Sequence, residues 1–119
     1  MGVAQRWDES RWGPLCIESV RALHQPPERF RVVPGCYPAG TSFVGSARAS
    51  RKYVLAGLCS YVVAGVTWGL RTGEMADSPG GDFAFRVLGD NPVVVVSVYE
   101  LPVTCWGSVP DAEPGTAAG

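Results

Sequence analysis

The chain lacks the long apolar segment that a membrane protein needs. A spanning helix requires roughly 18 to 20 apolar residues in succession, and the most apolar stretch, Tyr53–Leu70, is interrupted by glycine, serine and threonine. The first ten residues include Arg6, Asp8 and Glu9, so they contain no apolar core of a signal peptide. We therefore expect a cytoplasmic protein with no membrane partner.

An excess of charge of either sign is also missing. Ten lysine and arginine residues balance eleven aspartate and glutamate residues, which gives a net charge of −1. Arg48, Arg51 and Lys52 form the one basic cluster, and small residues are interleaved with them. Proteins that bind nucleic acid carry a basic surface, so we expect no nucleic-acid partner.

Metal-binding and disulfide patterns are absent as well. The four cysteines, Cys16, Cys36, Cys59 and Cys105, lie far apart, and the spacing of cysteine and histidine fits no zinc site. Without a signal peptide we expect reduced thiols. Cys36 and Cys59 are poor candidates for a nucleophile because no histidine is placed to raise their thiolate fraction.

The sequence does contain many short β-rich runs separated by glycine and proline. At 119 residues it has the length of one domain, and 46% hydrophobic residues supply a core. Turns every eight to twelve residues favour an all-β sandwich or barrel. The predicted strands are Phe30–Val33, Cys36–Tyr37, Thr41–Val44, Lys52–Leu55, Cys59–Val63, Val66–Leu70, Met75–Ser78, Phe83–Leu88 and Val93–Leu101.

The two ends of the chain differ from this pattern. Residues 1–29 are predicted to pack on the barrel of residues 30–107, with at most a short N-terminal helix over Leu15–Leu23, where a strand is equally compatible. Pro34-Gly35 is predicted as a turn. Residues 108–119 are rich in proline, glycine, alanine and acidic side chains, so we expect a disordered tail.

One turn-rich stretch resembles the second sequence motif of the cupins. In that motif a glycine is followed, after five residues, by a proline and then by a second glycine two positions later, as in Gly73, Pro79 and Gly81. Upstream, Lys52–Gly57 is similar to the strand that closes the first motif, and Val98–Pro102 is similar to the strand that ends the barrel. The resemblance implies a cupin-type antiparallel β-barrel, or jelly roll.

The metal ligands of the cupin motifs are not present. The resemblance places Ser50 where the family has glutamate and Ala84 where it has histidine. The paired histidine positions fall on Val44 and Ser46, or on Ser46 and Arg48, depending on the glycine from which the count begins. The resemblance therefore implies a barrel with no metal site and no cofactor.

Strand alternation then predicts which side chains enter the barrel. If Ser50 points inward, so does Lys52. If Ala84 points inward, so do Asp82 and Arg86. We predict Ser50, Asp82 and Ala84 to contact a small-molecule substrate.

Lys52 and Arg86 are the charged candidates for catalysis. A lysine in an apolar barrel loses hydration, so its pKa falls and it can act as a base or form a Schiff base; the alternative is a lysine at the rim with its ammonium in water. Arg86 could stabilise an oxyanion, or it could pair with Asp82 or Glu100.

The remaining candidates are aromatic or small. Cys59 and Tyr61 are predicted to face inward, and Tyr61 and Tyr99 are candidate proton donors, with core packing as the alternative. Cys59 and Trp68 are predicted to line the substrate cavity, although Trp68 could equally fill the core. His24 could serve as a base, but a surface loop position is the simpler interpretation.

Three functions remain compatible with this pattern. The first is a metal-independent enzyme that catalyses proton transfer, as a lyase, isomerase or cyclase of bacterial specialised metabolism. The second is a small-molecule sensor or carrier. The third is a dimerisation scaffold in which Tyr53, Val93–Val98 and Trp12 form the shared face of a homodimer.

Overall fold

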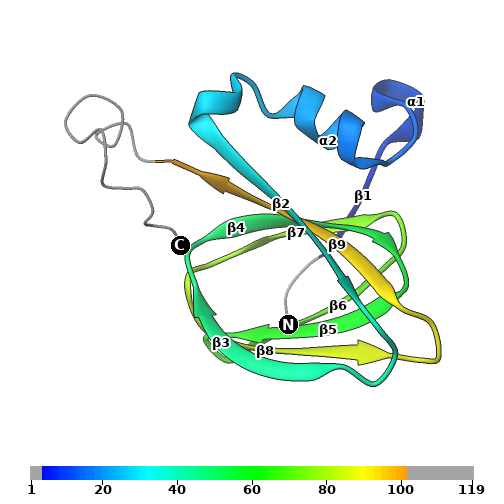
Figure 1. Cartoon of the computed structure of the whole chain (residues 1–119), viewed down its shortest axis with the longest axis vertical. Helices are drawn as coiled ribbons and strands as arrows, with labels where there is room; N and C mark the ends of the chain where they lie inside the picture. Colours follow the sequence, from blue (N-terminus) through cyan, green and yellow to red (C-terminus); the bar gives the residue numbers. More distant parts are fainter. Residues whose placement is uncertain (1–3, 102–119) are drawn as a thin grey trace.

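The protein forms two antiparallel β-sheets that enclose a common interior (Figure 1). The computed structural model describes residues 4–101. Sheet A has the strand order β1-β7-β4-β9-β2, and sheet B has the order β3-β8-β5-β6. The strands are β1 Gln5–Arg6, β2 Phe30–Tyr37, β3 Ser42–Ala47, β4 Ser50–Ala56, β5 Leu58–Val63, β6 Val66–Arg71, β7 Glu74–Ser78, β8 Gly81–Leu88 and β9 Val93–Glu100. The predicted jelly roll is confirmed.

The strands predicted from Lys52 onward are observed with their ends shifted by at most two residues. The prediction of a turn at Pro34-Gly35 is wrong, because β2 runs through both residues and pairs with β9 along its whole length. β2 is the edge strand of sheet A. Proline is tolerated on an edge, where its missing N–H can face away from the neighbouring strand.

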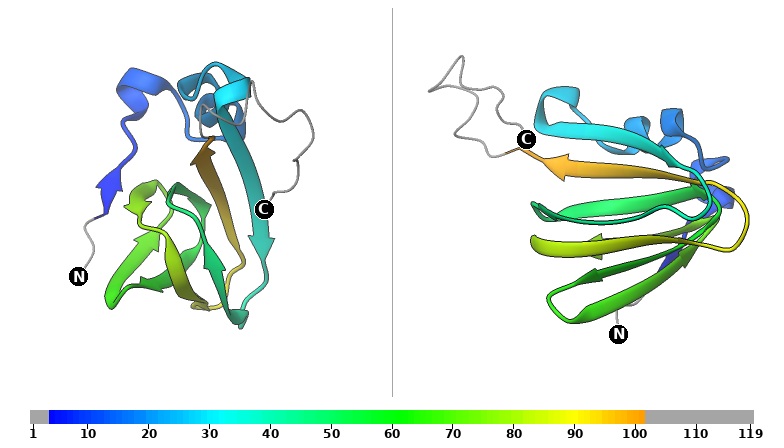
Figure 2. Two further views of the ribbon diagram at one scale, coloured as in Figure 1. Left: turned by 90° about the vertical axis from the view of Figure 1, so that its left-hand side faces the viewer. Right: turned by 60° about the horizontal axis from the view of Figure 1, so that its bottom comes forward.

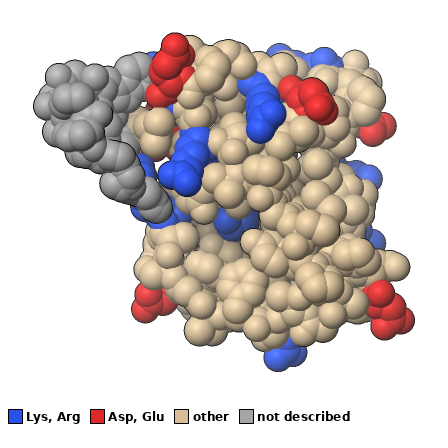
Figure 3. Space-filling view, viewed as in Figure 1, with Lys and Arg blue, Asp and Glu red and all other residues tan. Residues whose placement is uncertain are grey.

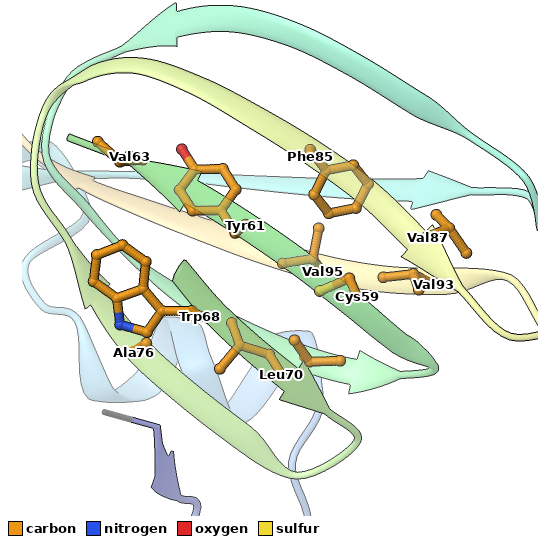
Figure 4. Close-up of a cluster of buried hydrophobic side chains, with 11 residues drawn as sticks. Cys59, Tyr61, Val63, Trp68, Leu70, Ala76, Phe85, Val87, Val93 and Val95 are labelled. Carbon is orange, nitrogen blue, oxygen red and sulfur yellow. The ribbon is translucent and has the colours of Figure 1, made fainter. Parts of the chain in front are cut away.

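The apolar alternation of the strands fills the interior. The buried side chains come from both sheets (Figure 4). Tyr61 and Phe85 from sheet B lie over Val93 and Val95 from sheet A, so the central strands of the two sheets hold the barrel together.

A glycine of the cupin-like pattern closes one end of this barrel. Gly57 has a φ of 94°, and a Cβ at this position would lie 2.5 Å from the carbonyl oxygen of Pro92. Only glycine tolerates both the conformation and the close approach. The chain therefore passes from β4 in sheet A to β5 in sheet B directly against the turn that precedes β9.

The N-terminal segment covers the outer face of sheet A (Figure 2). It contains α1 Glu9–Trp12, α2 Ile17–Leu23 and the 3₁₀ helix η1 Pro27–Arg29. α2 lies within the predicted range Leu15–Leu23, whereas α1 and η1 were not predicted. Trp7 and Val20 pack there against Tyr53, Val96 and Val98. None of the helices within residues 4–101 is long and apolar enough to cross a membrane.

This cover corrects the face predicted for a dimer. Tyr53 and Val96 are fully buried by the chain's own N-terminal segment, and Val93 lies in the barrel interior. Of the predicted face, Trp12 is exposed. The valine run is apolar on both sides because one side meets sheet B and the other meets the helices.

Candidate functional site

A cavity of about 120 Å³ lies inside the barrel beside β2 and β3, which are edge strands of the two sheets. Edge strands β2 and β3 both line it, through Val33 and Phe43 among others, and these two side chains are 37% and 36% exposed. The cavity therefore opens between the two edges. Its lining residues are Val33, Pro34, Gly35, Tyr37, Phe43, Ala47, Lys52, Tyr61, Phe83, Phe85, Val95, Ser97 and Tyr99.

Lys52 supplies the cavity with its charged group. It lies on the central strand β4, points inward and is 8% exposed, as strand alternation predicts. Its Nζ donates hydrogen bonds to Ser97 Oγ at 2.9 Å and to Ser50 Oγ at 3.2 Å. It also lies 4.9 Å from the ring centroid of Tyr61 and 5.9 Å from that of Tyr99.

No carboxylate pairs with this amine among the described residues. The ion pairs found in residues 4–101 are Arg29–Glu100 and Arg51–Asp77. Blue atoms are recessed near the middle of the face in Figure 3, whereas the acidic side chains lie towards its rim. Burial without a counter-ion lowers the pKa of Lys52 from 10.5 to about 8. A substantial fraction of the amine is therefore neutral near physiological pH.

Aromatic rings form the walls around the amine. Tyr37, Phe43 and Phe85 contact one another with ring centroids 5.0 to 5.4 Å apart, and Tyr61 stacks on Phe83 at 5.2 Å. Burial raises the pKa of Tyr61, so its hydroxyl stays protonated.

Two edge-strand glycines make room for these rings. A Cβ on Gly35 would lie 2.8 Å from the hydroxyl of Tyr37, and one on Gly45 would lie 2.9 Å from the ring of Phe83. A side chain at either position would push an aromatic wall into the cavity or out of it. The glycines in β2 and β3 therefore help to shape the site.

Two features of the sequence point to this site and were not used in the predictions. Lys52 is the one lysine in the chain, and the other nine basic residues are arginines. Ser97, the closest partner of the amine, was missed, although Val95, Ser97 and Tyr99 share one face of β9. The single lysine is thus the basic residue that lines the cavity, and no arginine lines it.

The predicted orientation of β8 is wrong. Phe83 and Phe85 face the interior, while Asp82, Ala84 and Arg86 are exposed on the outer face of sheet B. The prediction counted parity from a motif position, whereas the hydrophobic side chains determine which face is buried. Arg86 is therefore outside the cavity and cannot stabilise an oxyanion there.

The outer face of sheet B carries a wider and shallower depression of about 540 Å³. Asp82 and Ala84 line it together with Val44, which is 79% exposed. Its lining includes Asp82 as the sole ionisable side chain. It lacks the converging polar groups of the interior cavity, so we assign the site to the interior.

Cys59 and Trp68 are in the barrel but not at the cavity. Both are buried in the interior cluster, 1% and 6% exposed, and neither is among the cavity-lining residues. Burial raises the pKa of the Cys59 thiol to about 11, which keeps it protonated. The prediction that these two side chains line the cavity is wrong, because the cavity occupies the β2–β3 side alone.

His24 lies on the opposite side of sheet A from the cavity. Its Nε2 is 2.7 Å from the hydroxyl of Tyr53, and its ring packs against Phe30 and Tyr53. Burial, reinforced by the nearby Arg51, lowers the pKa of His24. His24 is half-buried rather than a solvated loop residue, and it does not reach the cavity.

Solved structures with the same fold are cupins. The cupin domain of Cnp3 from Schizosaccharomyces pombe aligns with a TM-score of 0.58 and 15% identity over 68% of this chain and 59% of that chain. The Cupin_2 domain of an XRE-family transcriptional regulator from Enterobacter cloacae aligns with a TM-score of 0.56 and 16% identity over 84% of this chain and 96% of that chain.

A third similar structure is an enzyme. The DMSP lyase DddQ from Ruegeria pomeroyi aligns with a TM-score of 0.54 and 20% identity over 63% of this chain and 40% of that chain. This chain thus spans less than two thirds of the Cnp3 domain and of the lyase. No protein-family model and no curated protein sequence matches the chain. The comparisons show the cupin fold.

The metal centre implied by the fold does not fit these residues. Within residues 4–101, no three histidine, cysteine, aspartate or glutamate side chains lie close enough to hold a metal ion together. Around the cavity the polar groups are an amine and hydroxyls, and an amine of a protonatable lysine is a poor companion for a cation. The chemistry of the site therefore has to be derived from Lys52 and its neighbours.

Proposed function

We propose that this protein, which has the cupin fold, is an enzyme that uses Lys52 as a general base in proton transfer on a small oxygenated molecule. The reaction classes that this includes are dehydration, isomerisation and cyclisation. The observation that carries the proposal is the chain's single lysine, enclosed in the barrel with hydroxyls and rings but, within residues 4–101, with no carboxylate paired to it. A base works best when its pKa lies near the working pH.

The residues around the cavity can account for each step of the proposed proton transfer. Lys52 Nζ takes the proton from the substrate, and Ser97 and Ser50 hold the amine at 2.9 and 3.2 Å. The hydroxyls of Tyr61 and Tyr99 are the candidates that donate a proton to the departing or developing oxygen. The aromatic walls limit the access of water to the amine, since Lys52 is 8% exposed.

Cavity size limits the substrate. An apolar cavity of about 150 Å³ holds one benzene molecule, and the cavity here measures about 120 Å³. Because the cavity is somewhat smaller than that and opens between β2 and β3, the substrate should be no larger than about one six-membered ring with a small substituent, and a nucleotide does not fit. The presence of a lyase among the similar structures supports elimination as one reaction of this class.

The test uses 1,2-benzisoxazole, which opens to 2-cyanophenol when a base removes its ring proton. We expect a turnover rate that rises with pH and levels off above about pH 8, where Lys52 becomes neutral. Lys52→Met should lower the rate by roughly 10² or more, the scale of general-base catalysis. Arg86→Ala is the matched control and should keep the rate, because Arg86 lies on the outer face. Equal rates for the wild type and Lys52→Met would contradict the proposal.

A second function is favoured by one comparison. The regulator's Cupin_2 domain aligns over 84% of this chain and 96% of its own length, which supports a cavity that senses a ligand without converting it. In that case small ligands should quench the tyrosine fluorescence of the cavity and be recovered unchanged, and benzisoxazole should not turn over faster than with Lys52→Met.

A further inference from the structure

The amine of Lys52 is the strongest nucleophile at the cavity. The other polar side chains there are the hydroxyls of Tyr37, Tyr61, Ser97 and Tyr99, which are weaker nucleophiles than a neutral amine. The thiol of Cys59 is protonated and does not line the cavity. An enclosed lysine with hydroxyl neighbours is the arrangement that forms covalent adducts with carbonyl compounds.

We propose that Lys52 forms a reversible imine with a small aldehyde or ketone bound in the cavity. This inference rests on the cavity being the functional site, and it adds a covalent step that general-base catalysis does not need. The neutral amine attacks the carbonyl carbon, a C–N bond forms, and the electrons of the C=O π bond move to oxygen. A proton passes from nitrogen to that oxygen and gives a carbinolamine. The carbinolamine then takes up a second proton on its hydroxyl, the C–O bond breaks, water leaves and a protonated imine remains.

The surroundings of the amine suit each of these steps. Ser97 Oγ lies 2.9 Å from Nζ, close enough to carry the proton from nitrogen to the carbinolamine oxygen. The protonated imine is a cation, and the ring of Tyr61, 4.9 Å from Nζ, stabilises it as it stabilises the ammonium. With no carboxylate paired to it among the described residues, the amine has no salt bridge to break before it attacks.

The cavity also selects the carbonyl compound. Its walls are Phe43, Phe83 and Phe85 together with tyrosine rings, so it favours a compound with one apolar or aromatic group. At about 120 Å³ it admits one six-membered ring with a small substituent or a small fused ring, as in benzaldehyde or 1,2-benzisoxazole, and excludes two fused six-membered rings. Benzaldehyde should therefore react at Lys52, and 1-naphthaldehyde should not.

The experiment traps the imine with sodium cyanoborohydride, which delivers hydride to the imine carbon and leaves a secondary amine. The variant Arg86→Lys carries Lys52 and one exposed amine at position 86 in the same molecule. Peptide mass analysis then compares the two sites directly. At pH 7 we expect benzaldehyde to label Lys52 at least tenfold faster than the introduced amine, because an exposed lysine is almost fully protonated there.

Two further measurements make the outcome specific. With 1-naphthaldehyde the introduced amine should be labelled at its usual rate and Lys52 should not. In protein unfolded by urea the labelling of Lys52 should fall to the rate of the exposed amine. Labelling of Lys52 that is no faster than labelling of position 86 in the folded protein overturns the inference. Benzisoxazole turnover that depends on Lys52 would persist in that case, so failure of the imine and failure of the proposed function are distinguishable.

Discussion

Lys52 and Tyr53 are consecutive residues of β4 and face opposite sides of sheet A. Lys52 enters the barrel, where it has two hydroxyl partners and an adjoining cavity. Tyr53 points outward under the N-terminal segment, where it is completely buried and packs against Trp7 and His24. Both side chains are buried, but Lys52 adjoins a cavity whereas Tyr53 is packed on all sides by other residues.

The outer environment is that of a packed core. Tyr53 has its hydroxyl 2.7 Å from His24 Nε2, and its ring meets Trp7 edge to face at 5.7 Å. The indole Nε1 of Trp7 donates to the carbonyl oxygen of Gly13 at 2.8 Å. The inner environment leaves an amine without a counter-ion beside open volume, which costs stability. Such a cost is typical of functional sites, so the difference between the two faces supports our proposal that the site is on the inner one.

The largest effect should come from the outer face. We expect Tyr53→Ala to lower the free energy of unfolding by about 3–5 kcal/mol, as for other buried aromatic residues, because the ring that joins the N-terminal segment to sheet A is lost. Tyr53→Phe is the matched control and should cost about 1 kcal/mol, the worth of one hydrogen bond. Urea titration measures both. A cost for Tyr53→Ala below that of Tyr53→Phe would show that the outer face is not a packed core.

The sequence predicts the barrel well because its strands follow simple rules. Apolar and β-branched runs between glycine and proline place most strands within two residues, and Gly57 is needed for a turn against Pro92. β2 continues through Pro34 because it is an edge strand, which is a property of the sheet and not of the segment. Only the tertiary arrangement distinguishes an edge from a centre.

The candidate site was predicted in part. Alternation along β4 and β5 correctly places Ser50, Lys52 and Tyr61 inside. Arg86 was placed inside by counting from Ala84, the position of the motif's histidine, although Phe83 and Phe85 show directly which face of β8 is buried. Which interior residues meet the cavity depends on where β2 and β3 separate, and no local pattern reports that.

Replacing Lys52 should change the free energy of unfolding by less than Tyr53→Ala does, and it should raise that free energy where Tyr53→Ala lowers it. The folded-state pKa of about 8 lies below the unfolded value of 10.5, so the folded protein holds a costly charge at every pH below about 8. That cost amounts to about 3 kcal/mol, and it is relieved as the pH rises from 8 to 10.5, because the unfolded chain then binds more protons. Lys52→Met removes the cost but also two hydrogen bonds of about 1 kcal/mol each.

We therefore expect the free energy of unfolding at pH 7 to be about 1–2 kcal/mol larger for Lys52→Met than for the wild type. The variant should accordingly unfold at a higher urea concentration. This advantage should shrink between pH 8 and pH 10.5. Lys52→Arg is the control that keeps a buried cation and should not gain stability at pH 7. A wild type more stable than Lys52→Met at pH 7 would mean that the inner face is packed like the outer one.

The smallest effect concerns His24 on the outer face. Burial, with the nearby Arg51, lowers the folded-state pKa of His24 below its ordinary value of 6.5. As the pH falls through 6.5 the unfolded chain takes up a proton before the folded one does, so the protein loses stability on acidification. The carboxylate of Asp77, which could stabilise an imidazolium, is paired with Arg51. In His24→Gln the amide can still bond to Tyr53 but does not titrate. Urea midpoints measured from pH 8 down to pH 5 should therefore fall more steeply for the wild type than for His24→Gln, and parallel curves would show that the contact between His24 and Tyr53 tolerates the charge.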